Sequence, residues 1–186
     1  MQATDNICPF ESSRPVLVPV DFSDCSRAAL IYAARLTADT RTPLLVLHVI
    51  HDSGNDPGYY RREHDANPLL PIADVASEML EDWLNKVRRE NPELDKTFKR
   101  VRMRLVAGLP GKRIVEVGEA EHALMIVMGT RGRTGLSHLL RGSVTEYVMS
   151  HASTPVTTLR KGIDAARGTE CLKLATSIED AVPRDH

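Results

Sequence analysis

Short apolar runs alternate with helical patterns along most of the chain. Five runs have the length and the β-branched content of strands: residues 15–20, 44–50, 101–107, 123–128 and 155–159. Several of them are apolar at nearly every position, which is typical of strands covered on both faces of a parallel sheet. With helices between the strands, the sequence predicts an α/β fold: a doubly wound, five-stranded parallel sheet with helices on both faces.

The segments between the runs show where the helices begin and which faces they bury. Ser23 is a good N-cap for a first helix over residues 24–38. Two further helices are expected over residues 111–122 and 142–151. The longest helix carries apolar side chains at spacings of three and four, at Ile72, Val75, Met79, Trp83 and Val87. Arg102 and Arg104 alternate with apolar residues, which predicts that the run 101–107 lies near an edge of the sheet.

The domain organisation follows from the same patterns. The chain has 186 residues, which suits one globular domain, expected over residues 14–160. Residues 1–13 are polar and predict a flexible N-terminal segment. Residues 51–71 are rich in turn formers, and a loop of that length is functional or disordered. The tail, residues 161–186, is predicted to be disordered or loosely docked, although residues 171–182 have the pattern of a short amphipathic helix.

Composition and charge exclude several classes of protein. The formal net charge is −1 and the pI is about 6.7, so nothing attracts the whole chain to nucleic acid or to anionic lipid. No apolar run approaches the roughly 18 residues of a membrane helix, and the first residues lack the pattern of a signal peptide. The three cysteines are far apart and form no metal or disulfide motif. A cytoplasmic protein without membrane insertion is expected.

A glycine-rich loop follows the fourth predicted strand. It reads GTRGRTGLSHLLRGS over residues 129–143 and leads into the last helix. Gly132 and Gly135 allow close approach to backbone amides, and the amino end of a helix favours negative charge. Arginines at 131, 133 and 141 can add positive charge. If the first and fourth strands are neighbours, this loop faces the VPVDFSDCS loop that begins near Asp21, and together they predict an anion or phosphate site.

The spacing in this loop resembles the universal stress protein family, in its ATP-binding branch. The family pattern is Gly, two residues, Gly, nine residues, then Gly and Ser or Thr, and here it is Gly129, Gly132, Gly142 and Ser143. The resemblance extends over residues 14–160 and includes VPVDFS, LHVI and STPV. It implies ATP as the ligand, with Mg²⁺ held mainly by the phosphates.

The resemblance also implies a role for individual positions. Pro19, Val20 and Asp21 match the adenosine-binding first loop, and Val49 matches a position that lines the adenine pocket. Met128 and Gly129 match positions near the ribose and base. The phosphate-binding part is matched by Gly132, Gly142, Ser143 and Val144, with Arg133 as a source of positive charge in the same loop. No catalytic residue and no metal-ligating side chain is assigned.

Other nucleotide-binding motifs fit less well. The loop is not GxGxxG and follows the fourth strand rather than the first, and GLPGKR at residues 108–113 lacks the full Walker pattern. The related pyrophosphatase-type enzymes carry an SGGxDS-like loop where this chain has DFSDCS. Simple structural roles remain open for some residues: Asp21 as a helix cap, Cys25 as a small buried side chain, and His48 as a core or pocket-edge residue. Met79 and Trp83 are interpreted as core packing.

Two functions from different classes remain at this level. The preferred hypothesis is a stress-response or regulatory protein in which Mg-ATP biases loop order or contacts with partners. The alternative is an enzyme, a slow ATPase or nucleotide phosphotransferase, with arginines stabilising phosphoryl charge. A family member that has lost nucleotide binding is disfavoured by the intact glycine spacing. The resemblance further implies a homodimer through the last strand, residues 154–159, and an unidentified regulatory protein partner is compatible with it.

Overall fold

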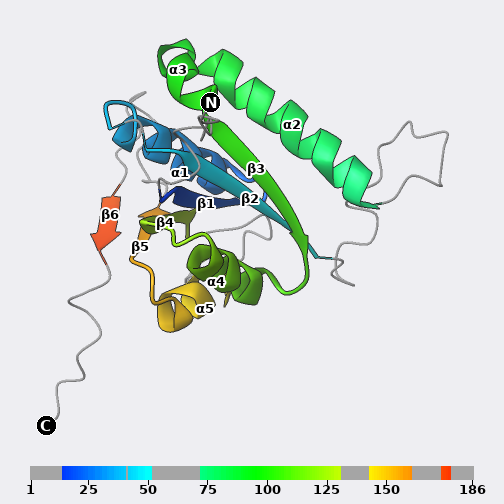
Figure 1. Ribbon diagram of the computed structural model, residues 1–186, viewed down its shortest axis with the longest axis vertical. Helices are drawn as coiled ribbons and strands as arrows, with labels where there is room; N and C mark the ends of the chain where they lie inside the picture. The colour runs from blue at the N-terminus through cyan, green and yellow to red at the C-terminus, as the bar shows by residue number, and fades with distance from the viewer. Residues whose placement is uncertain (1–13, 41, 52–71, 131–142, 161–172, 177–186) are drawn as a thin grey trace, which may run out of the picture.

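A single sheet lies between two layers of helices in the computed structural model, which describes residues 14–40, 42–51, 72–130, 143–160 and 173–176 (Figure 1). The described elements, in chain order, are β1 (Val16–Val20), α1 (Asp24–Leu36), β2 (Leu44–Ile50), α2 (Ile72–Glu90), the 3-10 turn η1 (Pro92–Leu94), α3 (Asp95–Phe98), β3 (Val101–Ala107), α4 (Pro110–Ala120), β4 (Met125–Gly129), α5 (Ser143–His151), β5 (Val156–Arg160) and β6 (Lys173–Thr176).

The strand order is β3-β2-β1-β4-β5-β6, and the first five strands of this order run parallel. The predicted doubly wound α/β fold with five parallel strands is therefore confirmed. The chain moves outward from β1 through β2 to β3, then crosses back and continues through β4 to β5 on the other side. The order thus reverses between β1 and β4, which is where open parallel sheets place their ligand sites.

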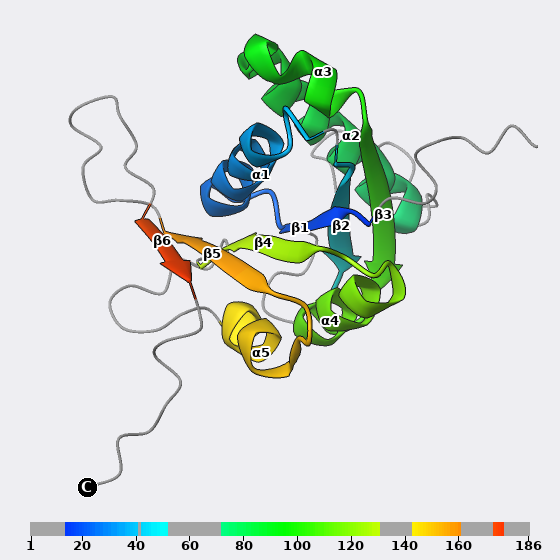
Figure 2. The ribbon, with the colours of Figure 1, turned by 60° about the vertical axis from the view of Figure 1, so that its left-hand side comes forward.

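Helices cover both faces of the sheet, with α1, α2 and α3 on one face and α4 and α5 on the other (Figure 2). Successive strand side chains point to opposite faces, so β1 sends Val16, Val18 and Val20 to the first layer and Leu17 to the second. Small side chains on α1 (Ala29, Ala33 and Ala34) are fully buried against the sheet. Burial of this apolar surface on both faces, roughly 1.5–3 kcal/mol for each large side chain, is the main source of stability.

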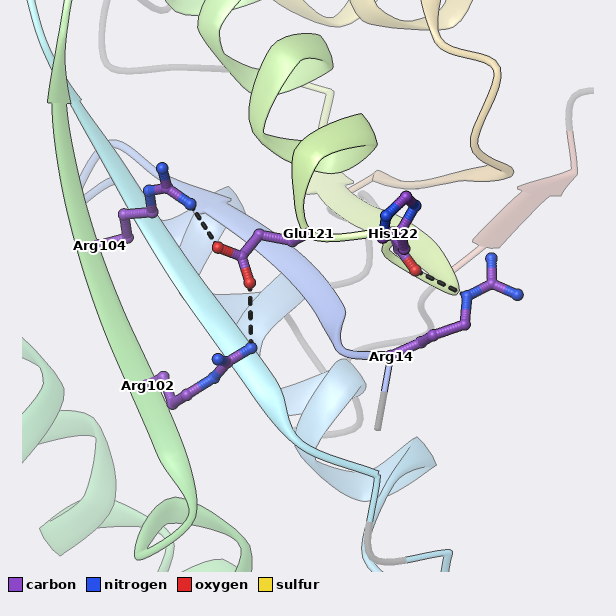
Figure 3. A network of polar contacts seen from close by, with 5 residues as sticks. All are labelled: Arg14, Arg102, Arg104, Glu121 and His122. Carbon is purple, nitrogen blue, oxygen red and sulfur yellow. Dashed lines mark hydrogen bonds and ion pairs between the residues drawn. The ribbon is translucent and has the colours of Figure 1, made fainter. Parts of the chain in front are cut away.

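Strand β3 forms one edge of the sheet, as its alternating pattern predicted. Arg102 Nη2 lies 3.2 Å from Glu121 Oε2, and Arg104 bonds to the other carboxylate oxygen of the same residue (Figure 3). The two arginines therefore share one side of the strand. Nearby, Arg14 Nε donates to the backbone carbonyl of His122 at 2.7 Å, which fixes the entry into β1 to the turn before β4.

The long helix α2 buries part of the predicted stripe, including Val75 and Val87, and adds Ala76 and Leu80 to it. Ile72 is 51% exposed, while Trp83 is partly buried against the core, as its interpretation as core packing required. Met79 is half-buried, and Leu80 beside it is fully buried.

Three short elements, η1, α3 and β6, were not predicted. The turn η1 buries Leu94 and the short helix α3 buries Phe98, and both side chains join the core cluster on the α1 side of the sheet. The tail contributes β6, which pairs antiparallel with β5 from Thr157↔Thr176 to Arg160↔Lys173. The helical interpretation of residues 171–182 is therefore wrong for residues 173–176. A sheet edge offers unpaired backbone groups, and pairing with them orders these four residues as a strand.

Candidate functional site

The loops that follow β1 and β4 leave the same edge of the sheet on either side of its switch point. β1 and β4 are hydrogen-bonded neighbours, with Val16 paired to Met125 and Leu17 to Ile126. This pairing does not extend to the last three residues of either strand, and Pro19 has no backbone N–H to contribute to it. The expected meeting of the Asp21 and Gly129 positions at one edge is therefore confirmed.

The Asp21 carboxylate is held by the turn that begins α1. Its Oδ1 accepts hydrogen bonds from the backbone N–H of Ser23 at 3.1 Å and from the Ser23 hydroxyl at 2.5 Å. Ser23 is also the N-cap of α1, where its oxygen accepts from Ser26 N at 3.2 Å. Asp21 thus supports the residue that caps the helix, and its charge lies near the positive end of the helix. This arrangement fixes the carboxylate at the edge of the sheet that β1 and β4 reach with their carboxyl ends.

Three of the predicted positions share one face of the sheet. Leu47 and Val49 of β2 and Met128 of β4 all belong to the buried cluster on the α4 and α5 side. Side chains two residues apart on a strand point to the same face. Leu17 and Ile126 are paired across β1 and β4 and both belong to this cluster, so Pro19 and Met128, each two residues further along, point to the same side. Pro19, Val49 and Met128 are buried, so they form an apolar surface beside the carboxylate loop. An apolar surface next to one fixed carboxylate suits a flat ring attached to a hydroxyl-bearing sugar.

Gly129 is required by packing. A Cβ at this position would lie 2.8 Å from both the carbonyl carbon and the Cβ of Cys25, in the first turn of α1. The end of β4 therefore approaches the backbone of α1 as closely as a glycine permits. Thr145 Oγ1 donates to the Gly129 carbonyl at 3.1 Å, which ties the first turn of α5 to the same point. Cys25 is buried, in agreement with its interpretation as a small buried side chain.

The remaining predicted positions divide between the start of α5 and the loop before it. Ser143 is exposed at the first residue of α5, and Val144 packs against the cluster on the α5 side. Gly132, Arg133 and Gly142 lie outside the described residues, so their roles stay predictions. Thr145 was not predicted, because nothing in the sequence distinguishes it from an ordinary helix residue.

An aromatic cluster lies on the other face of the sheet, next to Asp21. The ring of Phe22 contacts the rings of His48 and Trp83, with centroids 4.5 Å and 5.7 Å away. His48 Nδ1 is 2.8 Å from the Val20 carbonyl oxygen. Burial lowers the pKa of His48, against the opposing effects of the Val20 hydrogen bond and the Asp21 charge. His48 is thus buried and hydrogen-bonded, as predicted, while the part played by Phe22 was missed.

Two searches of the described residues gave no candidates. Within these segments no group of three or more His, Cys, Asp or Glu side chains could hold a metal ion. Over the same part of the chain, no helix has both the length and the apolarity that crossing a membrane requires.

The reversal of strand order, with a carboxylate loop and a glycine-ended strand on either side of it, defines a doubly wound α/β domain, a class that places its ligand sites at the switch point. The model of the universal stress protein family matches residues 12–160. The chain belongs to the universal stress protein family.

Several relatives illustrate the match. Universal stress protein MJ0577 of Methanocaldococcus jannaschii is 27% identical over 159 residues, covering 80% of this chain and 95% of that protein. A solved structure of MJ0577 superposes with a TM-score of 0.58 at 26% identity, covering 80% of this chain and 96% of that one. Rv2623 of Mycobacterium tuberculosis is 30% identical over 162 residues, covering 86% of this chain and 49% of that protein. A universal stress protein from Archaeoglobus fulgidus in complex with dAMP has the same fold, with a TM-score of 0.53 at 24% identity, covering 78% of this chain and 96% of that one.

Proposed function

We propose that this protein binds ATP, with Mg²⁺, as a regulatory ligand in a stress response. The observation that carries the proposal is the fixed Asp21 carboxylate beside the apolar surface of Pro19, Val49 and Met128, at the switch point of the sheet. A carboxylate accepts hydrogen bonds from ribose hydroxyls, and the apolar surface excludes water from an adenine ring.

The phosphate part of the ligand is assigned by the sequence pattern. Ser143 stands at the amino end of α5, where the helix dipole and unpaired backbone amides favour an anion. Gly132, Arg133 and Gly142 complete that part of the proposal. The Archaeoglobus protein in complex with dAMP shares the fold at 24% identity. That similarity does not decide the ligand, so the proposal depends on the residues of this chain.

The proposal is for binding, and turnover is not part of it. Asp21 Oδ1 is engaged by Ser23, so the carboxylate acts as a fixed acceptor. Bound nucleotide changes function only if it prefers one state of the loops or of an assembly. ATP hydrolysis well above that of a Gly142→Val variant would instead favour the slow ATPase or phosphotransferase.

We also propose that the chain pairs with a second copy through residues 154–159, on the condition that β6 leaves the edge of β5. The outer edge of β5 is paired with β6 in the single chain. A second copy that uses this edge must therefore displace β6. Nucleotide-dependent contacts with a regulatory protein partner are a further part of the proposal.

Thermal unfolding with Mg-ATP, ADP, AMP and GTP tests the ligand. A ligand at about 100 times its Kd adds about 2.7 kcal/mol, which raises Tm by roughly 5–10 °C at this chain length. We expect the shift to be larger for ATP than for AMP or GTP, and to be much smaller in Asp21→Asn. The matched control is Asp39→Asn, an exposed carboxylate after the carboxyl end of α1, at the opposite end of the sheet. No shift for any nucleotide, in protein shown by extraction to carry none, would overturn the proposal.

A further inference from the structure

The turn that carries Asp21 is held from both sides. Val20, the last residue of β1, precedes it, and Phe22 follows it. Phe22 has a φ of 63°, in the left-handed region that bulky residues rarely adopt. A turn with such a residue persists only when its surroundings enforce it. The direction of the Asp21 side chain therefore depends on what holds Val20 and Phe22.

His48 contacts both of these residues. Its Nδ1 lies 2.8 Å from the Val20 oxygen, and because a carbonyl can only accept, Nδ1 carries the proton and donates. This bond adds to the strand pairing, in which Val20 is already level with His48. The same imidazole contacts the Phe22 ring, which also contacts the Trp83 indole of α2. With only 3% of its surface exposed, His48 is enclosed in this position.

The position of His48 on β2 separates it from the apolar surface proposed for the ligand. Side chains alternate along the strand, so Leu47 and Val49 point to the α4 and α5 side while His48 points to the α1 and α2 side. His48 therefore acts through the turn and has no place in the proposed adenine contact. A change at His48 can alter the Asp21 turn without removing the apolar surface.

We propose that His48 is a positioning residue of the nucleotide site: its hydrogen bond to Val20 and its packing on Phe22 fix the turn that presents the Asp21 carboxylate. This inference rests on the proposed function for its effect on ligand affinity. It extends that function by assigning a residue on the opposite face of the sheet to the same site.

Two substitutions separate the hydrogen bond from the bulk of the side chain. His48→Asn places an amide N–H close to where Nδ1–H stands, and His48→Leu removes the donor while keeping an apolar volume. We expect His48→Leu to weaken Mg-ATP about tenfold by titration calorimetry, and His48→Asn to retain affinity within about threefold of the parent chain. The matched control is Val46→Ala, which removes buried volume from β2 on the same face, two residues earlier. It should lower stability and leave the affinity unchanged.

Hydrogen exchange in the ligand-free chain gives a second, independent readout. The amides of Asp21, Phe22 and Ser23 should exchange faster in His48→Leu and at the parent rate in Val46→Ala. Unchanged exchange at these amides, or equal losses of affinity in His48→Asn and His48→Leu, would overturn the inference. If the parent chain binds no nucleotide, the proposed function fails, and the exchange rates alone decide whether His48 positions the turn.

Discussion

Replacing Gly129, the last residue of β4, by alanine should destabilise the protein, because the added methyl group would clash with α1. The added Cβ would lie 2.8 Å from the carbonyl carbon of Cys25 and 2.9 Å from its oxygen. Both atoms belong to the backbone of the first turn of α1, so relief requires moving a helix against the sheet. Overpacking of this kind costs about 1–3 kcal/mol. The smaller conformational freedom of alanine in the unfolded chain offsets about 0.4–1 kcal/mol of that cost.

At the middle of these two ranges the net loss is about 1.3 kcal/mol, which corresponds to a decrease in Tm of roughly 3–5 °C at this chain length. Gly118→Ala in α4 is the matched control. There the new Cβ would meet the end of the Ile126 side chain at 3.3 Å and the end of Leu17 at 3.6 Å. Alanine also favours a helix by about 1 kcal/mol over glycine. We expect Gly118→Ala to change stability by less than about 1 kcal/mol in either direction.

Differential scanning calorimetry of the parent chain, Gly129→Ala and Gly118→Ala tests whether close packing against α1 requires a glycine at position 129. The packing explanation requires a clear decrease in Tm for Gly129→Ala alone. A Gly129→Ala chain as stable as the parent, or equal losses in the two variants, would show that the close approach of β4 to α1 does not determine this glycine. A Gly129→Ala chain that keeps its Tm but loses Mg-ATP would assign the glycine to the ligand instead.

Three further predictions concern other parts of the molecule. Because burial lowers the pKa of His48, the unfolded chain takes up a proton at a higher pH than the folded chain does. The free energy of unfolding should therefore rise as the pH increases toward about 6.5, and urea unfolding should show a smaller slope in His48→Asn. Glu121→Gln should cost no more than about 1 kcal/mol in urea, since the pairs with the two arginines of β3 are partly exposed, and Glu81→Gln on the surface of α2 should cost nothing measurable. Ala175→Pro should weaken the β6 ladder and raise the dimer fraction in light scattering, whereas an unchanged mass at every concentration would argue against a second copy at the β5 edge.

The sequence predicted the fold because the short apolar runs of the strands and the three-and-four spacing of the helices are both clear in it. The runs that became β1 and β2 are apolar at nearly every position, and the arginine alternation in β3 correctly indicated an edge. The strand β6 could not be predicted in the same way. It has four residues in a polar tail, and it forms through pairing with β5, a contact that local patterns do not encode.

The site was predictable where it depends on motif and topology. Asp21 and Gly129 were expected to meet because each follows a strand at the reversal of the sheet, and the structure confirms this. Phe22 was missed because a left-handed backbone is normally signalled by glycine or asparagine, and no such residue occurs there. The contact of Gly129 with Cys25 was also not predictable, since it depends on how closely a helix and a strand approach in space.

The central place of β1 has a consequence for synthesis of the chain. β2, the first neighbour of β1, is synthesised soon after β1. The other neighbour is β4, so Val16 can pair with Met125 only after the residues between them have been synthesised. At about 5–20 residues per second, that interval is roughly 5–20 seconds. During this interval β1, a strand that is buried along its whole length in the finished fold, has one unpaired side, which is open to pairing with other nascent chains. The topology therefore exposes one edge of β1 to aggregation during synthesis, until β4 is made and the sheet can close.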